Sequence, residues 1–277
     1  MNLSNLNLNT HKIGFIGCGN MASAIIRGLV SGGFPASQLC VSNSSAEKLK
    51  QLSLETNMQT TSNNREVADF SDVLVLAIKP QVLPQVCEQL KDINLTHKLI
   101  ISIAAGITTD KIAEYLAQSP SIIRAMPNTP ATIAKGATGL FANQQSSQSQ
   151  KECAQSIFNA IGISEWVDNE SLIDVVTAIS GSSPAYVYML IESMIEQAVN
   201  QGLDQTIARN LATQAVLGAA ELVQAQPHKA LKELRQQVTS PNGTTAAAID
   251  SFEQHDFSNI IKQAVAAAVA RGKELGE

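Results

Sequence analysis

A glycine-rich stretch near the start of the chain, residues 13–22 (IGFIGCGNMA), most limits what this sequence can fold into. It matches the G-x-G-x-x-G/A pattern that binds dinucleotides when it joins a strand to a helix. In that setting Gly17 permits the tight turn, Gly19 lets the backbone approach a pyrophosphate, and Ala22 allows close packing of helix on strand. The same letters also suit a turn that binds nothing, so the surrounding sequence has to decide.

Short apolar runs alternate with helical patterns through the first half of the chain. The run at 72–78 (DVLVLAI) is almost wholly apolar, which is typical of a strand covered on both faces. We expect strands over 12–17, 38–42, 72–78, 99–103, 121–125 and, at an edge, 162–167, and helices over 21–31 and 46–54. The polar stretch 142–150 is expected to be a loop entering a helix. This order predicts an α/β fold whose N-terminal part is a Rossmann-like doubly wound parallel sheet.

The second half of the chain, from near Leu172, differs in composition and in hydrophobic pattern. It is rich in Ala, Leu, Val and Gln, and its alanines would permit close packing of helices. We expect helices over 186–201, 205–225, 227–238, 244–252 and 257–275. The predicted domains are therefore 1–168, an NAD(P)-binding Rossmann domain, and 169–277, an all-helical domain.

Composition excludes several classes of function. A net charge of −5 offers no broad cationic surface for nucleic acid. No apolar run approaches the roughly 20 residues of a membrane span, and the polar leader over 1–12 lacks the features of a signal peptide. The four cysteines are far apart and the four histidines are scattered, which indicates reduced thiols in the cytoplasm and no metal site.

The end of the second predicted strand bears on the choice of cofactor. An NAD site usually places a carboxylate there, about 20 residues after the glycines, to bind the ribose 2′-hydroxyl. Here residues 41–45 read VSNSS, with no acid before Glu47 and with Lys48 one turn further on. Hydroxyl and amide groups would not repel a 2′-phosphate, so the stretch favours NADP, although an uncommitted polar turn fits it equally well.

Further stretches suit a ligand site, and each also suits an ordinary structural role. Lys79 follows a buried strand, at the edge of the sheet where ligands of such folds bind. Asn128 and Thr129 stand between two prolines that would stiffen their loop. Residues 179–186 (ISGSSPAY) resemble the start of a long helix. Residues 238–245 (VTSPNGTT) predict a sharp turn before a helix whose first amides could hold a carboxylate.

Together these stretches resemble the pyrroline-5-carboxylate reductase family. The resemblance spans nearly the whole chain through FIGCGNM, AIKPQ, SIAAGI, RAMPNTP, SGSSPAY and LRQQVTSPNGTTAAAI, in this order. The last of these fits the family signature, a hydrophobic helix followed by S-P-x-G-x-T and another helix. The chain departs from the common pattern at Asn242, where a second glycine is usual, and at Gln237, where some relatives have Asn. Because Asn tolerates left-handed backbone, we expect the turn to survive.

The resemblance implies reduction of the cyclic imine 1-pyrroline-5-carboxylate to L-proline with NADP(H) or NAD(H), the last step of proline biosynthesis. It also implies that the helical domain binds substrate and forms a homodimer, which assembles further, for example into a decamer. The cofactor site implied by the resemblance comprises Ile16, Gly17, Cys18, Gly19, Asn20, Met21, Ser44, Asn64, Ala77, Ile78, Lys79, Pro80, Ala104 and Ala105. The implied substrate site comprises Glu170, Val238, Gly243, Thr244 and Thr245.

The chemistry agrees with these residues. A protonated imine is already electrophilic, so the protein has to orient cofactor and substrate rather than supply a nucleophile or a metal. We expect the amides of Gly243 and Thr244 to bind the carboxylate and Thr245, the catalytic residue, to hydrogen-bond the ring nitrogen. One alternative is a dehydrogenase of β-hydroxy acids, disfavoured because no lysine lies between Ser180 and Gln201. Another is a nucleotide-sensing protein without turnover, which would not need the 238–245 turn.

Overall fold

A computed structural model describes residues 11–276, so most of the polar leader lies outside the described residues. The described chain forms two compact units. One comprises the residues through Ser182 together with those from Ala268 onward, and the other comprises Ser183–Ala267.

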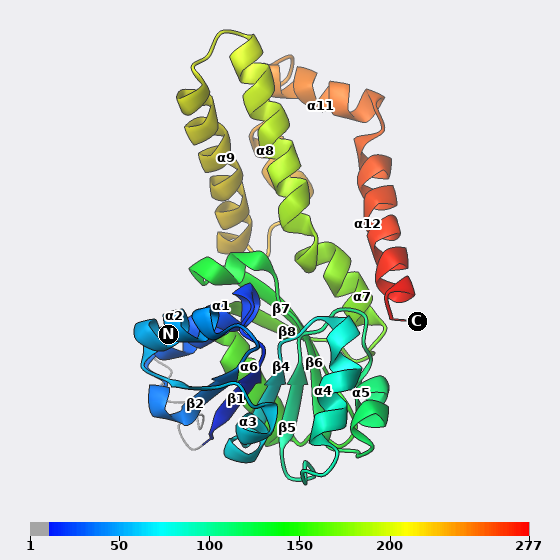
Figure 1. The fold of residues 1–277 in the computed structure, drawn as a ribbon. Helices are drawn as coiled ribbons and strands as arrows, with labels where there is room; N and C mark the ends of the chain where they lie inside the picture. Colours follow the sequence, from blue (N-terminus) through cyan, green and yellow to red (C-terminus); the bar gives the residue numbers. More distant parts are fainter. Residues whose placement is uncertain (1–10, 277) are drawn as a thin grey trace. The chain divides into compact units, whose positions relative to one another are not determined.

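The first unit is built on a sheet of eight strands (Figure 1). In spatial order they are β3 (Gln59–Thr61), β2 (Leu39–Ser42), β1 (Ile13–Ile16), β4 (Val73–Leu76), β5 (Leu99–Ser102), β6 (Ser121–Met126), β7 (Gly136–Ala142) and β8 (Gly162–Trp166). All neighbours pair in parallel except β6 and β7. The chain leaves β1 toward β2 on one side and returns to β4 on the other, which makes the β1–β4 boundary the topological switch point of the sheet.

Helices cover both faces of this sheet. The α-helices are α1 (Asn20–Ser31), α2 (Ala46–Thr56), α3 (Asn64–Phe70), α4 (Leu83–Leu90), α5 (Thr109–Leu116), α6 (Gln148–Asn159) and α7 (Leu172–Val176). Short helical segments are η3 (Ala36–Gln38), η4 (Pro80–Val82), η5 (Thr129–Ile133) and the π-helical η6 (Thr177–Gly181). Apolar side chains of α1, α2 and α6 pack on one face, and those of α3, α4 and α5 pack on the other.

The apolar strands explain this two-layer core. In β4, Val73 and Val75 join the core of one face while Leu74 and Leu76 join that of the other, and all four side chains are buried. Because successive side chains of a strand point to opposite faces, a strand covered on both sides has to be apolar throughout. The doubly wound sheet predicted from the sequence is therefore confirmed.

Some elements were not predicted. Strand β7, with the sequence GATGLFA, combines two glycines and two alanines, which have weak strand propensity. The segment of α7 and η6 was also missed, and α10 begins at Leu231 rather than at 227, because residues 226–230 form a turn.

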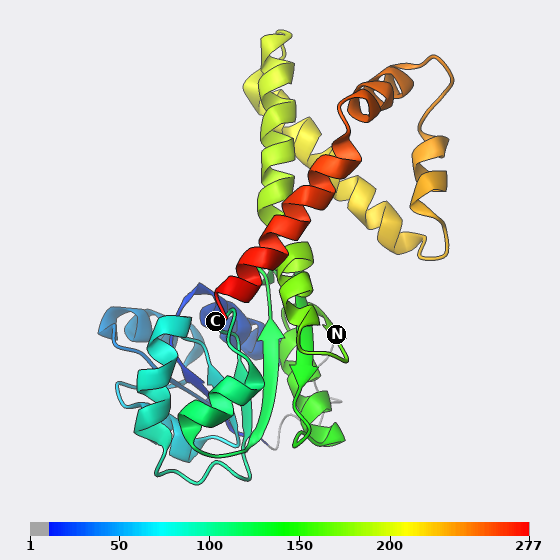
Figure 2. The same cartoon turned by 90° about the vertical axis from the view of Figure 1, so that its right-hand side faces the viewer.

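The second unit is entirely helical. It comprises α8 (Ser183–Asn200), α9 (Gln205–Ala225), α10 (Leu231–Gln237), α11 (Thr244–Gln254) and most of α12 (Phe257–Glu274). Helices α8 and α9 pack against each other (Figure 2). Within this unit only Ala208 and Ala212 are buried among the described residues, whereas large apolar side chains such as Met189 and Leu211 are mostly exposed. The compact units divide after Ser182, so the boundary at 168/169 remains a prediction about domains rather than a feature of packing.

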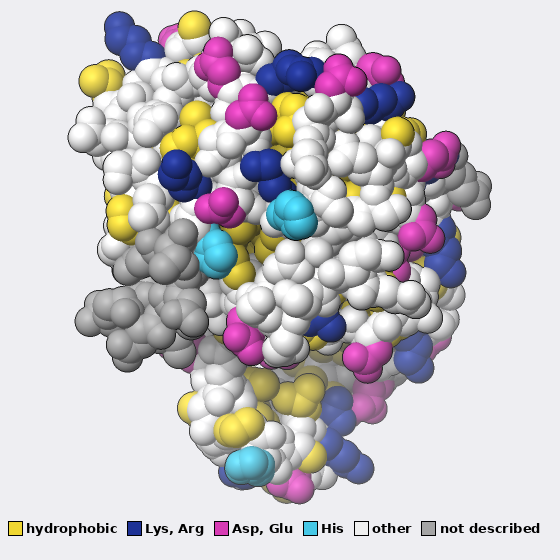
Figure 3. Space-filling view, turned by 90° about the horizontal axis from the view of Figure 1, so that it is seen from below, with side chains coloured by type: hydrophobic (Ala, Val, Ile, Leu, Met, Phe, Trp, Pro, Cys, Tyr) yellow, Lys and Arg dark blue, Asp and Glu magenta, His cyan; other side chains and the backbone are white. Residues whose placement is uncertain are grey.

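Figure 3 shows basic and acidic side chains interspersed on the face drawn, without a continuous basic patch. Over residues 11–276, no helix is both long and apolar enough to cross a bilayer. The same residues contain no group of His, Cys, Asp or Glu side chains arranged to hold a metal ion.

Candidate active site

The glycine turn joins β1 to α1 at the carboxyl edge of the sheet. Gly17 has a φ of +103°, and a Cβ atom there would lie 2.3 Å from the carbonyl oxygen of Ala77, so the position requires glycine. A Cβ at Gly19 would have no atom within 4 Å, which leaves open space beside the backbone. Gly19 is the N-cap of α1, no side chain caps the helix, and its first helical bond runs from Ser23 N–H to Gly19 O at 2.9 Å.

This arrangement fits a pyrophosphate. The amides of Asn20, Met21 and Ala22 precede that first helical bond, so they remain available to an anion. The positive end of the helix dipole lies at the same place. The open space at Gly19 is where a side chain would obstruct the approach of a phosphate.

The ends of two further strands lie at the same edge. Ala77 N–H donates to Ile16 O at 2.8 Å, and Ile103 N–H donates to Leu76 O at 3.2 Å, so the segments after β1, β4 and β5 are neighbours. The expected cofactor residues Ala77–Pro80 and Ala104–Ala105 stand in these segments. Parallel pairing thus brings together stretches that are far apart in the sequence.

The end of β2 is neutral and polar. Gly17 N–H donates to Ser42 O at 2.8 Å, and Cys18 N–H donates to the Asn43 side chain at 3.3 Å. Ser42 Oγ donates to Asn64 Oδ1 at 2.7 Å, which ties the start of α3 to this edge. Ser44 is exposed there. The expected cofactor residues in these segments therefore lie at one edge of the sheet.

The turn at 240–245 belongs to the helical unit. Asn242 has a φ of +59°, which confirms that asparagine takes the left-handed position of the turn. Gly243 N–H donates to Ser240 O at 3.0 Å, so this amide is used within the turn and is not available to a carboxylate, contrary to our expectation. The first helical bond of α11 runs from Ala247 N–H to Gly243 O at 3.1 Å, and no side chain caps the helix. The amides of Thr244 and Thr245 therefore remain available.

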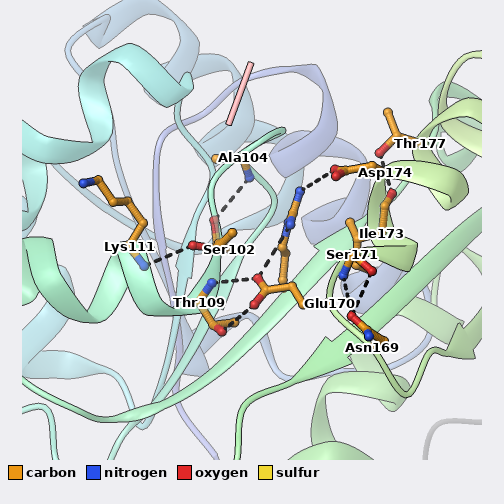
Figure 4. A network of polar contacts seen from close by, with 12 residues as sticks. Ser102, Ala104, Thr109, Lys111, Asn169, Glu170, Ser171, Ile173, Asp174 and Thr177 are labelled. Atoms are coloured by element: carbon orange, nitrogen blue, oxygen red, sulfur yellow. Dashed lines mark hydrogen bonds and ion pairs between the residues drawn. The ribbon is translucent and has the colours of Figure 1, made fainter. Parts of the chain in front are cut away.

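Glu170 lies in the sheet unit within a network of polar contacts (Figure 4). Its carboxylate accepts hydrogen bonds from Thr109 N–H at 2.7 Å and from Thr109 Oγ1 at 2.9 Å. Arg124 Nη1 lies 3.6 Å from Glu170 Oε1, and Arg124 Nη2 lies 3.2 Å from Asp174 Oδ1. The expected substrate residue is thus held at both oxygens, and its side chain keeps 18% of its surface exposed.

Arg124 and Asp174 have no role that was predicted from the sequence. The available signal was a cation directly after two isoleucines in the strand SIIRAM. Asn128, by contrast, is occupied structurally, because its amide donates to Ser180 O at 3.0 Å and accepts from Ala137 N–H at 2.8 Å. This supports the structural interpretation of the loop between the two prolines.

Two of the four buried thiols are in surroundings that keep them unreactive. All four cysteines are free and buried. Burial raises the pKa of the Cys87 thiol to about 12, and burial together with the charge of Asp72 raises that of Cys153 to about 12. Both therefore stay protonated near neutral pH, so neither is a nucleophile.

Comparisons with known proteins show which families this chain is similar to. Residues 170–275 match the family model for pyrroline-5-carboxylate reductase dimerisation, and residues 12–106 match that for coenzyme F420-dependent NADP oxidoreductases. The pyrroline-5-carboxylate reductase of Vibrio alginolyticus is 42% identical over 264 residues, covering 95% of this chain and 97% of the relative.

Two solved structures are similar over almost their whole length. That of a pyrroline-5-carboxylate reductase from Coxiella burnetii has a TM-score of 0.92 and 43% identity, and covers 97% of this chain and 100% of that one. The Plasmodium falciparum pyrroline carboxylate reductase, solved with NADP bound, has a TM-score of 0.87 and 32% identity, and covers 97% and 99% of the two chains.

Proposed function

This chain belongs to the pyrroline-5-carboxylate reductase family, and from that membership we propose that it reduces 1-pyrroline-5-carboxylate to L-proline with NADP(H) as the preferred cofactor. The similarity over nearly the full length of both proteins carries the proposal, since it includes both units. The alternative of a β-hydroxy-acid dehydrogenase shares the fold but not this similarity.

The glycine turn supports a nicotinamide dinucleotide at the carboxyl edge of the sheet. Amides of the first turn of α1 would hold the pyrophosphate, and Gly19 would leave room for it. The ends of β4 and β5 would line the rest of the site through Ala77–Pro80 and Ala104–Ala105. When bound, the cofactor supplies the hydride.

The preference for NADP rests on the end of β2. Ser42, Asn43 and Ser44 supply hydroxyl and amide groups, and the first carboxylate after the strand is that of Glu47, in the first turn of α2. Asn64 fixes this edge through its bond from Ser42 Oγ. Lys48, exposed on the first turn of α2, adds a positive charge nearby in sequence.

For the substrate, we propose that the amides of Thr244 and Thr245 bind its carboxylate and that the Thr245 hydroxyl hydrogen-bonds the ring nitrogen. These amides are available because no side chain caps α11. Val238 and Gly243 would shape the turn around this position, and Glu170 is the further residue proposed to bind the imine. Threonine is a weak acid, so Thr245 orients the substrate rather than acting as a general acid.

The helical unit supports a homodimer as the functional species. It carries the match to the dimerisation family, and its exposed apolar side chains have no cover within the described chain. A homodimer that assembles further, for example into a decamer, is part of the proposal, as is a cytoplasmic location suited to its four free thiols. Light scattering would decide the assembly state.

The deciding experiment follows the absorbance of NADPH and of NADH with 1-pyrroline-5-carboxylate as substrate. We expect turnover with both cofactors and a higher kcat/KM with NADPH. Absence of turnover with the imine would refute the function, and a higher kcat/KM with NADH would refute the preference alone.

A further inference from the structure

The buried guanidinium group of Arg124, in the sheet unit, is surrounded by more negative than positive charge. The side chain of Arg124 is only 3% exposed, yet it stands in a strand whose other residues, apart from Ser121 at its start, are apolar. Its two partners, Glu170 and Asp174, are both carboxylates with 18% and 14% of their side-chain surface exposed. The three groups together bear a net charge of −1.

Such a network is costly to bury, since the desolvation of charges offsets much of their attraction. Arg124 Nε also has no hydrogen-bond partner among the described residues, so the guanidinium is not fully satisfied. An arrangement built only for stability would balance the charges and satisfy each donor. The excess negative charge instead favours a cation beside the network.

The network adjoins the proposed cofactor edge. Arg124 pairs with Ser102 of β5 in the parallel register, and Ser102 Oγ accepts a hydrogen bond from Ala104 N–H at 3.3 Å. Thr109, which holds both oxygens of Glu170, begins the helix that follows the same loop. The excess charge is therefore a neighbour of residues proposed to line the cofactor site.

The other charged groups near the network are exposed or paired with a different partner. On α5, Asp110 is exposed and Lys111 pairs with Glu114 at 3.0 Å. On the last turns of α12, where Gly272 lies beside Asp174, Lys273 is exposed and Arg271 pairs with Glu274 at 2.7 Å. Strand β7 places the uncharged Phe141 opposite Arg124.

We propose that Arg124 and Asp174 are positioning residues for Glu170, and that the net negative charge of the three favours the protonated form of the imine substrate. This inference rests on the proposed function. Arg124 and Thr109 both bind the carboxylate of Glu170 and so fix its position. Because Asp174 also pairs with Arg124, the positive charge of Arg124 is shared between two carboxylates and does not fully neutralise Glu170. The protonated imine accepts the hydride at its carbon, the electrons of the C=N double bond pass to nitrogen, and the resulting amine then takes up a proton from solvent.

The test is the pH dependence of kcat/KM for 1-pyrroline-5-carboxylate at saturating NADPH, with Asp174→Asn as the main variant. This change removes one charge and keeps the shape. At an effective dielectric constant of about 20, a unit charge about 12 Å away shifts a pKa by about one unit, and a nearer charge shifts it further. We therefore expect the alkaline limb of the profile to move to lower pH by about one unit or more, with the Kd for NADPH, measured by its fluorescence, unchanged.

Two variants serve as controls. Asp174→Glu restores the charge and should restore the profile. Asp69→Asn removes an exposed carboxylate of the same unit and should leave the profile unmoved. A fall in Tm for Asp174→Asn with an unchanged profile would overturn the proposal, because it would make the role purely structural.

Arg124→Lys provides the second measurement if Asp174→Asn does not fold. Lysine keeps the positive charge but cannot pair with Glu170 and Asp174 at the same time through two nitrogen atoms. KM for the imine should therefore rise several-fold, while the pH profile of kcat/KM stays in place. An unchanged KM would overturn the positioning role. Failure of the unmodified protein to reduce the imine would refute the proposed function instead, so the two failures are distinguishable.

Discussion

Replacement of Gly17 by alanine should damage both stability and cofactor binding. At a φ of +103° a residue with a side chain is strained by about 1–3 kcal/mol. Its Cβ would also lie 2.3 Å from the carbonyl oxygen of Ala77, and backbone would have to move by about 1 Å to reach ordinary contact. Such overpacking adds about 1–3 kcal/mol. We expect a loss of about 4 kcal/mol, which lowers Tm by roughly 8–16 °C.

Substitutions at two other glycines separate the effect of backbone strain from that of the steric clash. Gly33 has a φ of +92° but no atom within 4 Å of the position that a methyl group would take, so Gly33→Ala should show the strain alone, about 1–2 kcal/mol. Gly19 has a φ of −81° and also has open space, so Gly19→Ala should leave the Tm of the unliganded protein unchanged or slightly raised. Its methyl group would nevertheless occupy the space proposed for the pyrophosphate, and the Kd for NADPH should rise about tenfold or more.

The assay is a thermal melt of each variant without ligand, followed by titration with NADPH monitored by fluorescence. If Gly17→Ala were no more destabilising than Gly33→Ala, the clash with Ala77 would be refuted. If Gly19→Ala bound NADPH as tightly as the unmodified protein, the pyrophosphate would have to lie elsewhere. Either result stands independently of the other.

Three further changes address the cofactor, the substrate and the thiols. Ser44→Asp should lower the kcat/KM ratio of NADPH to NADH, because a carboxylate repels a 2′-phosphate and accepts from a 2′-hydroxyl; a constant ratio would contradict our interpretation of the β2 end. Thr245→Ala should lower kcat at least tenfold while the Kd for NADPH changes little, and the reverse pattern would remove Thr245 from the substrate site. The contribution of Cys87 and Cys153 to the free energy of unfolding, measured with denaturant, should be constant below about pH 8.5 and fall from there toward pH 12, because unfolded thiols ionise near 8.5 whereas the raised pKa values keep both thiols protonated in the folded protein. A double Cys87→Ala and Cys153→Ala variant should flatten this decline, and an equally steep decline would assign it to other groups.

The sequence predicted those parts of the fold whose local pattern agrees with their environment. Strand β4 is apolar on both faces and buried on both, so its pattern has one interpretation. Strand β7 was missed because its glycines lower its strand propensity, and the reason for a glycine there lies in a contact with another part of the chain. A Cβ at Gly139 would lie 2.4 Å from the Val176 side chain, and that contact comes from α7, far along the chain. A close approach of this kind cannot be recognised without the partner.

In the candidate site, too, some features follow from the local sequence and others depend on contacts between distant segments. Gly17, Gly19 and the turn at Asn242 follow from short local rules, and the structure bears out their backbone geometry. The partners of Glu170 do not follow from any spacing, because Thr109, Arg124 and Asp174 come from three separate elements. Likewise the use of the Gly243 amide by Ser240 depends on the shape of the turn and not on its letters.

The sparse burial in the helical unit has a consequence for how variants of this protein have to be measured. With only Ala208 and Ala212 buried among its described residues, the unit derives little cohesion from its own side chains. In a homodimer, a substitution on the exposed apolar surface would then change the dissociation constant before it changed a melting curve recorded on concentrated protein. A loss of about 1.4 kcal/mol corresponds to a tenfold change in that constant. Dilution series, rather than single melts, are therefore the sensitive test of damage to this half of the chain.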